Sequence, residues 1–262
     1  MYDEDEVEKK EAYLIAPGRP AEPDAPEPPW RKQRTSGRKP LSQEAIVDAA
    51  ISVLDRDGAD AVSMRNVAKE LNAGAASLYW HVASKGELID LIIDRAAGEL
   101  DLPEPDPFRW QEQLKEAAHQ ELELLLRHRD LARLRLGRIP MGPKVVKWLE
   151  WSLRLLRSAG IPASQAALFG DLFHVYIGHF AFERSLGAQP AAAGNISVNA
   201  TLETVRDYLA SLPKQQFPNI TSMVDEIIDP DVNKRFEFGL DLILKGLESY
   251  ARPTKGVKTA PA

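Results

Sequence analysis

Residues 63–88, with the sequence SMRNVAKELNAGAASLYWHVASKGEL, indicate the fold of this chain more strongly than any other stretch. Ser63 is a good helix N-cap, because its hydroxyl can accept a hydrogen bond from a free backbone N–H of the first turn. The apolar residues after it share one face of a helix of about two turns, namely Val67, Ala68 and Leu71. A turn through Gly74 then leads into a second short helix over residues 75–82. Two short helices joined by such a turn are typical of a helix-turn-helix unit.

Helical patterns continue on both sides of this unit. Upstream, Ser42 can cap a helix whose apolar residues recur at helical spacing, namely Ile46, Ala49, Ala50, Val53 and Leu54. Downstream, Ser84 and Glu87 form a capping box that opens a helix over residues 88–100. The sequence therefore predicts a three-helix helix-turn-helix domain over residues 41–102.

The rest of the chain is also expected to be helical. A proline-rich break after residue 102 opens a second, larger domain over residues 103–251, followed by a flexible tail over residues 252–262. Helices are predicted at roughly 107–128, 130–137, 143–159, 163–186, 200–211 and 231–251. Loops are expected over 187–198 and 212–229, the second with one helical turn around 223–227. The predicted fold class is all-α.

The charge of the chain is unevenly distributed. Residues 1–30 have a net charge of −6, equal to that of the whole chain, whereas residues 31–40 have a net charge of +5 from Arg31, Lys32, Arg34, Arg38 and Lys39. Seven prolines fall within the first forty residues, so we expect a disordered acidic tail that ends in a basic arm. Such an arm neutralises DNA phosphates. A solubilising tail without contact to DNA is the alternative.

The composition excludes several classes of protein. The chain has no cysteine, which rules out disulfides, thiol nucleophiles and cysteine-ligated metal sites. No uncharged apolar run approaches the roughly 20 residues of a membrane span, and no secretory signal opens the sequence, so a cytoplasmic protein is expected. Nucleophile elbows, phosphate loops and zinc motifs are absent, so we expect neither an enzyme nor a cofactor. His179 and Glu183 lie four residues apart, but a structural role is favoured over metal binding.

The second short helix has the features of a helix that enters the DNA major groove, with small residues at its start and polar or aromatic groups that face outward. The candidate DNA contacts on it are Ala75, Ala76, Ser77, Tyr79 and His81. Arg65 and Lys85 flank it and can reach a base edge or a phosphate. Leu78 and Val82 are expected to face the core, with Trp80 beside them. A three-helix bundle without a role in DNA binding is the alternative.

The run from Leu41 to Asp90 resembles the DNA-binding domain of the tetracycline-repressor (TetR) family. The resemblance lies in Met64-Arg65-x-Val-Ala68, in Leu-Tyr-Trp-His-Val over residues 78–82, and in Lys85-x-Glu-Leu88. A weaker similarity continues to about residue 250, through Trp110, His128-Arg-Asp130, Gly178-His-Phe180 and residues 236–248. It implies a homodimeric repressor that binds a palindromic DNA operator and releases it when a small-molecule effector binds the second domain. It also adds Met64 to the DNA contacts, whereas Ala75 and Ala76 replace Gln and Pro of the tetracycline repressor and imply a different operator.

The resemblance also places a ligand pocket in the second domain. Tetracycline-binding members hold a magnesium chelate with a histidine and neighbouring polar residues just before the proline that corresponds to Pro140. Different side chains occupy those positions here, namely Arg135, Arg138 and Ile139, with Ala117 and Glu121 on the preceding helix. We therefore do not expect tetracycline–magnesium as the ligand.

The candidate pocket residues are mostly aromatic or apolar. They are Trp110, His119, Leu122, Arg135, Arg138, Trp148, Trp151, Phe169, Phe173, His174, Ile177 and Phe182. Aromatic walls with one or two arginines suit a large planar anionic molecule, such as a polyketide. An ordinary apolar core is the alternative for such an aromatic stripe.

Two apolar stripes predict dimerisation. Small and aromatic residues line the helix over 163–186, namely Ala166, Gly170, Phe173 and Ile177, and larger ones line that over 231–251, namely Phe236, Leu240, Ile243, Leu244 and Leu247. In the family such helices form a two-fold four-helix bundle. An intramolecular core is the alternative use of the same stripes.

Predictions for two clusters of charged residues, and for how the protein is regulated, remain. Five arginines between residues 127 and 138 are predicted to form a solvated face, with a role near the domain interface as the alternative. Asp55, Asp57 and Asp60 are predicted to be turn and solvent-facing residues. The function predicted is ligand-responsive repression by a homodimer. The alternative is a DNA-binding activator or repressor controlled by a protein partner that contacts the acidic tail.

Overall fold

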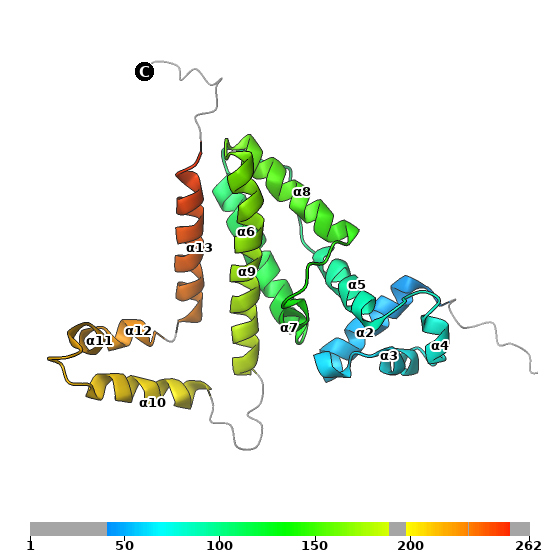
Figure 1. Ribbon diagram of the computed structural model, residues 1–262, viewed down its shortest axis with the longest axis horizontal. Coiled ribbons are helices and arrows are strands. Elements are labelled where there is room, and N and C mark those ends of the chain that lie inside the picture. Colours follow the sequence, from blue (N-terminus) through cyan, green and yellow to red (C-terminus); the bar gives the residue numbers. More distant parts are fainter. Residues whose placement is uncertain (1–40, 189–197, 230, 252–262) are drawn as a thin grey trace, which may run out of the picture. The chain divides into compact units, whose positions relative to one another are not determined.

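The computed structural model describes residues 41–188, 198–229 and 231–251, and the regular elements of these residues are all helices (Figure 1). The first part of the chain contains α2 (Gln43–Asp57), the 3-10 helix η1 (Ala59–Ala61), α3 (Met64–Glu70), α4 (Ala75–Leu78) and α5 (Lys85–Ala97). The second part contains α6 (Trp110–Arg127), α7 (Leu131–Arg135), α8 (Pro143–Ser158), α9 (Ala163–Ala188), α10 (Val198–Ser211), α11 (Pro218–Ser222), α12 (Val224–Ile227) and α13 (Val232–Glu248). The predicted all-α class is confirmed.

Several predictions fall outside the described residues. They concern the acidic tail, most of the loop expected over 187–198, the C-terminal tail, and the basic arm with Arg31, Lys32, Arg34, Arg38 and Lys39. Among the helices that the structure does describe, none is both long enough and apolar enough to cross a membrane.

The first part of the chain packs around the apolar face of α2. Ile46, Ala50 and Leu54 of that face are fully buried, and α2 contacts both α3 and α5. From α5, Leu88 and Ile92 complete the same core with no exposed surface. Burial of these apolar side chains is the main force that holds such short helices together, because helices of this length are marginal on their own.

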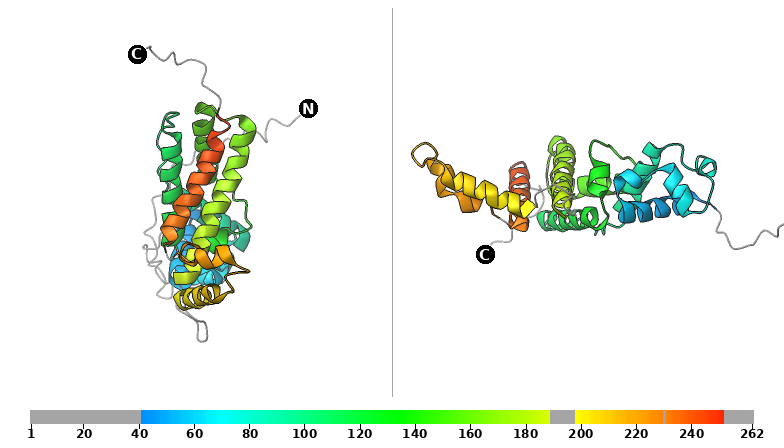
Figure 2. Two further views of the ribbon diagram at one scale, coloured as in Figure 1. Left: turned by 90° about the vertical axis from the view of Figure 1, so that its left-hand side faces the viewer. Right: turned by 90° about the horizontal axis from the view of Figure 1, so that it is seen from below.

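The second part is built on α9, which contacts α6, α7, α8 and α13. Phe173 and Ile177 of α9 are completely buried. The C-terminal helix α13 lies along α9 in both orientations of the molecule (Figure 2). There the Tyr176 ring stacks on Phe236 at 5.6 Å, and its hydroxyl donates a hydrogen bond of 2.8 Å to the Phe236 carbonyl. The aromatic side chains of this region therefore fix α13 against α9.

Several helix boundaries differ from the prediction. The helix expected from residue 107 begins at Trp110, because Asp106 Oδ1 accepts the Phe108 N–H in a local turn. The helix expected over 88–100 covers Lys85–Ala97, since helical residues begin directly after the N-cap Ser84. The loop expected over 212–229 contains two short helices, α11 and α12. The second of them, α12, corresponds to the helical turn predicted around residues 223–227 and begins one residue later.

Candidate functional site

The turn between α3 and α4 is fixed by backbone geometry. Ser63 Oγ accepts the Asn66 N–H at 3.2 Å and starts α3. At the other end Asn72 has a positive φ of 50°, a conformation that asparagine tolerates better than most residues. The Ala73 N–H then donates to the Ala68 carbonyl at 2.8 Å. Together these bonds turn the chain sharply into α4, as a helix-turn-helix requires.

The residues expected to contact DNA divide into three groups. Arg65, Ala76, Tyr79, His81 and Lys85 are exposed, and Ala75 and Ser77 are half-buried. Met64 is buried, with 6 % of its surface exposed, which corrects its assignment as a contact. It shares the inward face of α3 with Val67, Ala68 and Leu71, three, four and seven residues further on.

The end of α4 also differs from the prediction. Regular α-helix stops at Leu78, and residues 79–81 form a turn. Leu78 and Val82 are buried as predicted. Trp80 is not beside them: 89 % of its surface is exposed, since it lies in this turn rather than on the inward face of a helix. An exposed tryptophan therefore adjoins the candidate DNA-contacting residues, which the sequence pattern did not predict.

Four of the five arginines between residues 127 and 138 bond to the first part of the chain, as the alternative of a role near the domain interface supposed, and three of these four are also exposed. Arg129 Nη1 donates to the Arg56 carbonyl at 2.9 Å. Arg133 forms two hydrogen bonds with Asp60, at 2.9 and 3.0 Å. Asp60 is exposed, as predicted, and its ion pair with Arg133 is an additional finding. Sequence spacing could not indicate these two contacts, because the partners lie 73 residues apart in the sequence.

Two further contacts join these parts around the buried carboxylate of Asp130. Asp130 Oδ2 accepts the Ala59 N–H at 3.0 Å, and this bond is buried. Nearby His128 Nδ1 lies 3.0 Å from Asp55 Oδ2. The start of α7 is therefore attached directly to η1, which precedes the helix-turn-helix.

The loop after α7 is attached to α5. Arg138 Nε donates to Asp90 Oδ1 and its Nη2 donates to the Gly86 carbonyl, both at 2.8 Å. Asp94 Oδ1 accepts the N–H groups of Lys144 and Val145, at 2.8 and 3.1 Å, at the start of α8. A carboxylate at a helix N-terminus is favourable, because it satisfies free N–H groups and the helix dipole. This loop thus contacts the helix that directly follows the helix-turn-helix.

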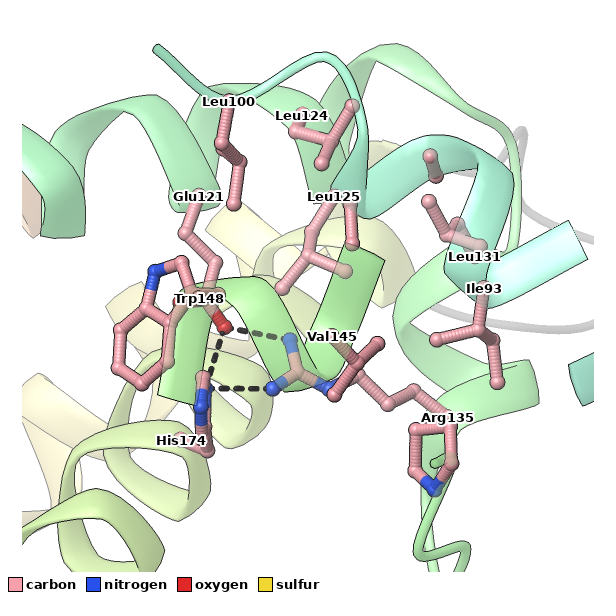
Figure 3. A pocket seen from close by; sticks show the side chains of 13 residues that line it. Ile93, Leu100, Glu121, Leu124, Leu125, Leu131, Arg135, Val145, Trp148 and His174 are labelled. Atoms are coloured by element: carbon pink, nitrogen blue, oxygen red, sulfur yellow. Dashed lines mark hydrogen bonds and ion pairs between the residues drawn. The ribbon is translucent and has the colours of Figure 1, made fainter. Parts of the chain in front are cut away.

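Two adjacent cavities lie beside this loop. The inner one, which we call the chamber, has a volume of about 50 Å³ and is lined by Ile93, Ala96, Ala97, Leu100, Glu121, Leu124, Leu125, Leu131, Arg135, Pro140, Val145, Trp148 and His174 (Figure 3). The outer one, which we call the groove, has a volume of about 400 Å³ and is lined by residues 132, 135–141, 145, 148–149, 167, 170–171, 174–175 and 178–179. Arg135, Trp148 and His174 line both cavities.

Glu121, Arg135 and His174 meet inside the chamber, as Figure 3 shows. Arg135 Nη1 donates a short hydrogen bond to Glu121 Oε1. His174 Nδ1 lies 2.9 Å from the same oxygen and 2.6 Å from Arg135 Nη2. The His174 ring also packs on Trp148, with 4.2 Å between the ring centroids. Three polar side chains from α6, α7 and α9 thus form one compact group.

The Glu121 carboxylate is charged in spite of its burial. Only 2 % of its side chain is exposed. Burial by itself would raise the pKa of the Glu121 carboxyl, but the charge and hydrogen bond of Arg135, with a contribution from His174, outweigh it and lower this pKa to about 2. The chamber therefore holds an ion pair in which the arginine charge is compensated within the protein.

The candidate pocket residues are only partly brought together. Arg138 lines the groove, and Arg135, Trp148 and His174 line both cavities. The remaining candidates line neither cavity, namely Trp110, His119, Leu122, Trp151, Phe169, Phe173, Ile177 and Phe182. Most of these are core side chains, as the alternative interpretation of an aromatic stripe supposed.

The partners of two of these residues explain their positions. Trp151 Nε1 donates to the Pro103 carbonyl at 2.6 Å. His119 Nε2 lies 2.7 Å from Glu237 of α13, on a partly exposed surface. Neither side chain is therefore directed at the two cavities.

Glu121 was not among the candidate pocket residues, although the sequence contains a signal for it. It falls on the apolar face of α6, four residues after Ala117, three after Ala118 and four before Leu125. A carboxylate within an apolar stripe needs a buried partner. The partner itself, Arg135, lies on another helix and could not be identified from spacing.

Comparison with known proteins identifies the family. The model described as "Tetracyclin repressor-like, C-terminal domain" matches residues 102–251, and that described as "Bacterial regulatory proteins, tetR family" matches residues 46–92. The chain belongs to the TetR family of transcriptional regulators. Its N-terminal helix-turn-helix and helical C-terminal domain are those of this family.

Individual TetR relatives are similar over most of their length. The HTH-type transcriptional repressor DrrR1 of Streptomyces coeruleorubidus is 30 % identical over 244 residues, which is 88 % of this chain and 87 % of DrrR1. The tetracycline repressor of class D from Escherichia coli is 28 % identical, over 79 % of this chain and 89 % of its own. The crystal structure of ActR from Streptomyces coelicolor in complex with actinorhodin is 40 % identical, with a TM-score of 0.75, and the match covers 82 % of this chain and 98 % of ActR.

Proposed function

We propose that this TetR-family protein is a ligand-responsive transcriptional repressor, which binds a palindromic operator as a homodimer and is released by a small aromatic effector. The named relatives support the proposal, since DrrR1 is a repressor and ActR binds actinorhodin. The chief structural support is the attachment of α7. That short helix places Arg135 in the chamber at one end and, through Asp130 and Arg133, contacts η1 of the DNA-binding part at the other.

The proposed DNA interface is the exposed face around α4. Tyr79, His81 and Lys85 supply hydrogen-bond donors and positive charge there, and Arg65 adds a guanidinium that can contact a guanine edge. Ala75, Ala76 and Ser77 keep the start of α4 small, which permits close approach to the bases. Arg31, Lys32, Arg34, Arg38 and Lys39 remain a proposed phosphate-binding arm outside the described residues.

The proposed homodimer uses a different face from the stripes predicted. Ala166, Phe236, Leu240 and Leu247 are buried within the chain itself, Ile243 is half-buried, and Gly170 lines the groove. Apolar residues on the opposite side of the same helices are exposed, namely Leu168, Leu172 and Val175 of α9 and Phe238 and Leu242 of α13.

This exposed face supports association with a second copy of the chain. Leu168, Leu172 and Val175 recur at spacings of four and three residues on α9, and Phe238 and Leu242 lie four apart on α13, so each set lies along one side of its helix. A helix with apolar residues on its exposed side as well as its buried side is normally covered on both sides. Two such helices from each of two chains would form a four-helix bundle with two-fold symmetry.

The proposal is tested by fluorescence anisotropy with labelled DNA from the region upstream of the protein's own coding sequence. Specific binding that actinorhodin or another planar aromatic compound reverses is expected. Competition with unlabelled DNA of unrelated sequence is the control for specificity. Specific binding that no aromatic compound reverses would instead favour control by a protein partner. Absence of specific binding by an intact dimer would contradict the repressor assignment for this DNA.

A further inference from the structure

The chamber contains polar atoms whose hydrogen bonds are incomplete. Glu121 Oε2 and Trp148 Nε1 are both buried, and neither has a hydrogen-bond partner among the residues that the structure describes. Buried polar groups are normally paired, because an unpaired one loses its water without compensation. An ionised carboxylate is an acceptor only, so Glu121 Oε2 lacks a donor.

The position of His174 further limits the number of hydrogen-bond donors to the Glu121 carboxylate. Its Nδ1 lies within hydrogen-bond distance of both Arg135 Nη2 and Glu121 Oε1. One ring nitrogen cannot accept from the guanidinium and donate to the carboxylate at the same time. When it accepts from Arg135, the guanidinium is the donor left to Glu121. The carboxylate then has one paired oxygen and one unpaired oxygen.

The charge balance of the chamber revises the expected ligand. An anionic molecule was expected because arginine binds carboxylates. Arg135 is already paired with Glu121, so an additional carboxylate in the chamber would face a buried negative charge. A neutral group that donates a hydrogen bond is favoured instead.

The volumes of the two cavities indicate which part of such a ligand each cavity can hold. The groove, at about 400 Å³, lies within the range of small-molecule sites, roughly 300–1,000 Å³. The chamber, at about 50 Å³, has space for a few water molecules or one small substituent. Because Arg135, Trp148 and His174 line both, a molecule in the groove lies next to the chamber.

We propose that the chamber is a subsite for one uncharged hydroxyl of an aromatic effector, which donates its hydrogen bond to Glu121 Oε2 while the ring system lies in the groove against Trp148 and His174. Glu121 is then the residue that selects hydroxylated over O-methylated or carboxylated aromatic molecules. This inference rests on the proposed function, since it specifies the effector of the same regulator.

The first test compares three probes that share one ring system: 2-hydroxyanthraquinone, 2-methoxyanthraquinone and anthraquinone-2-carboxylate. Affinities are measured by quenching of tryptophan fluorescence on the full-length protein without DNA, near pH 6, where the phenol is neutral. The hydroxyl compound is expected to bind about 10- to 100-fold more tightly than the other two, as for a hydrogen bond to a charged group. Equal affinities, tighter binding of the carboxylate, or no binding by any of the three would overturn the proposal.

The second test uses variants. In Glu121→Gln the acceptor charge is lost and the Arg135 charge is uncompensated, so the preference for the hydroxyl compound should disappear and the carboxylate should gain affinity. Glu123→Gln makes the same chemical change at an exposed position of α6 and should preserve the wild-type order. An unchanged order in Glu121→Gln would also overturn the proposal. If that variant fails to fold, the three affinities of the wild-type protein still decide the question.

The binding tests need no operator, so they are independent of the proposed function. A hydroxyl preference without release of DNA would preserve the subsite and contradict ligand-responsive repression. Release of DNA by aromatic compounds without a hydroxyl preference would support ligand-responsive repression and contradict the subsite.

Discussion

Asp130 accepts the backbone N–H of Ala59 through its Oδ2 at 3.0 Å, across 71 residues of sequence. The bond is buried and joins the start of α7 to η1, directly after the first helix of the DNA-binding part. Gly58 precedes Ala59 with a positive φ of 85°, and a Cβ at this glycine would lie 2.8 Å from Asp130 Oδ2. A residue without a side chain is therefore required for both the backbone conformation and the close approach of the carboxylate.

Replacement of Gly58 tests this requirement. Gly58→Ala should lower the free energy of unfolding by about 1–3 kcal/mol, because it combines a left-handed backbone with steric contact at the carboxylate. Urea denaturation measures the change. Gly74→Ala is the control, since this glycine has a φ of −76° and no atom within 4 Å of the added Cβ. Equal stabilities of wild type and Gly58→Ala would show that the contact adapts without cost.

Removal of the Asp130 carboxylate tests the coupling between effector binding at the chamber and DNA binding. In Asp130→Ala, the effector that releases DNA from the wild type should still bind, but the release should weaken about 5-fold or more, within the usual range of coupling between two sites. Anisotropy titrations with and without effector measure both affinities. Arg154→Ala, which removes an exposed ion pair with Glu104, should leave the coupling unchanged. If the effector weakens DNA binding by Asp130→Ala as much as by the wild type, the contact between Asp130 and Ala59 has no part in the release of DNA.

The ionisation of Glu121 predicts a dependence of stability on pH. Its carboxyl pKa in the folded protein is about 2, below the ordinary value of 4.5. Glu121 therefore contributes stability above pH 4.5, and this contribution is lost as the pH falls from 4.5 towards 2. The loss is on the order of 3 kcal/mol for a shift of this size.

Urea denaturation at several pH values measures this effect. The free energy of unfolding of Glu121→Gln should vary less over the acidic range than that of the wild type, whereas Glu123→Gln should follow the wild type. Parallel curves for wild type and Glu121→Gln would contradict the assigned ionisation.

Arg65 is expected to contact operator DNA. Arg65→Ala should weaken specific binding by about 1–3 kcal/mol and relax the preference at one base pair if the guanidinium contacts a guanine edge. Titrations against operator variants distinguish this from loss of a phosphate contact, which weakens all sequences alike. Lys147→Ala removes an exposed positive charge from α8 and serves as the control. Unchanged affinity in Arg65→Ala would remove this residue from the interface.

The exposed stripe of α9 predicts the oligomeric state. Leu172 has 52 % of its surface exposed, and Leu172→Glu should convert the dimer to monomer because it places a charge in the apolar interface. Light scattering coupled to size-exclusion chromatography measures the mass. Val146→Glu alters a similarly exposed apolar residue on α8 and should remain dimeric. A dimeric Leu172→Glu protein would place the interface elsewhere.

Much of the local structure follows from the sequence. Ser42, Ser63 and Ser84 were predicted to cap helices, and each hydroxyl accepts a backbone N–H at the predicted helix start. These bonds form between residues three apart. Their prediction needs no knowledge of the rest of the chain.

The candidate site follows from the sequence only in part. Arg135, Trp148 and His174 were recognised from family resemblance as pocket residues, and the structure brings them together. The role of Glu121 as their buried counter-charge was missed, and so were the attachments of Asp60 and Asp130. Each of these contacts joins segments separated by at least 14 residues, so no helical period relates the partners.

The sequence by itself determined the all-helical class, the helix-turn-helix and the serine caps of its helices, because capping and periodic burial act within a few residues. Only the tertiary structure decided which side of α9 and α13 is covered and which arginines are paired. A periodic pattern states that a helix has an apolar face, but the neighbour that covers it is set by packing between distant segments. The same packing determines the solvation and partner of each charge, and so the chemistry of the chamber.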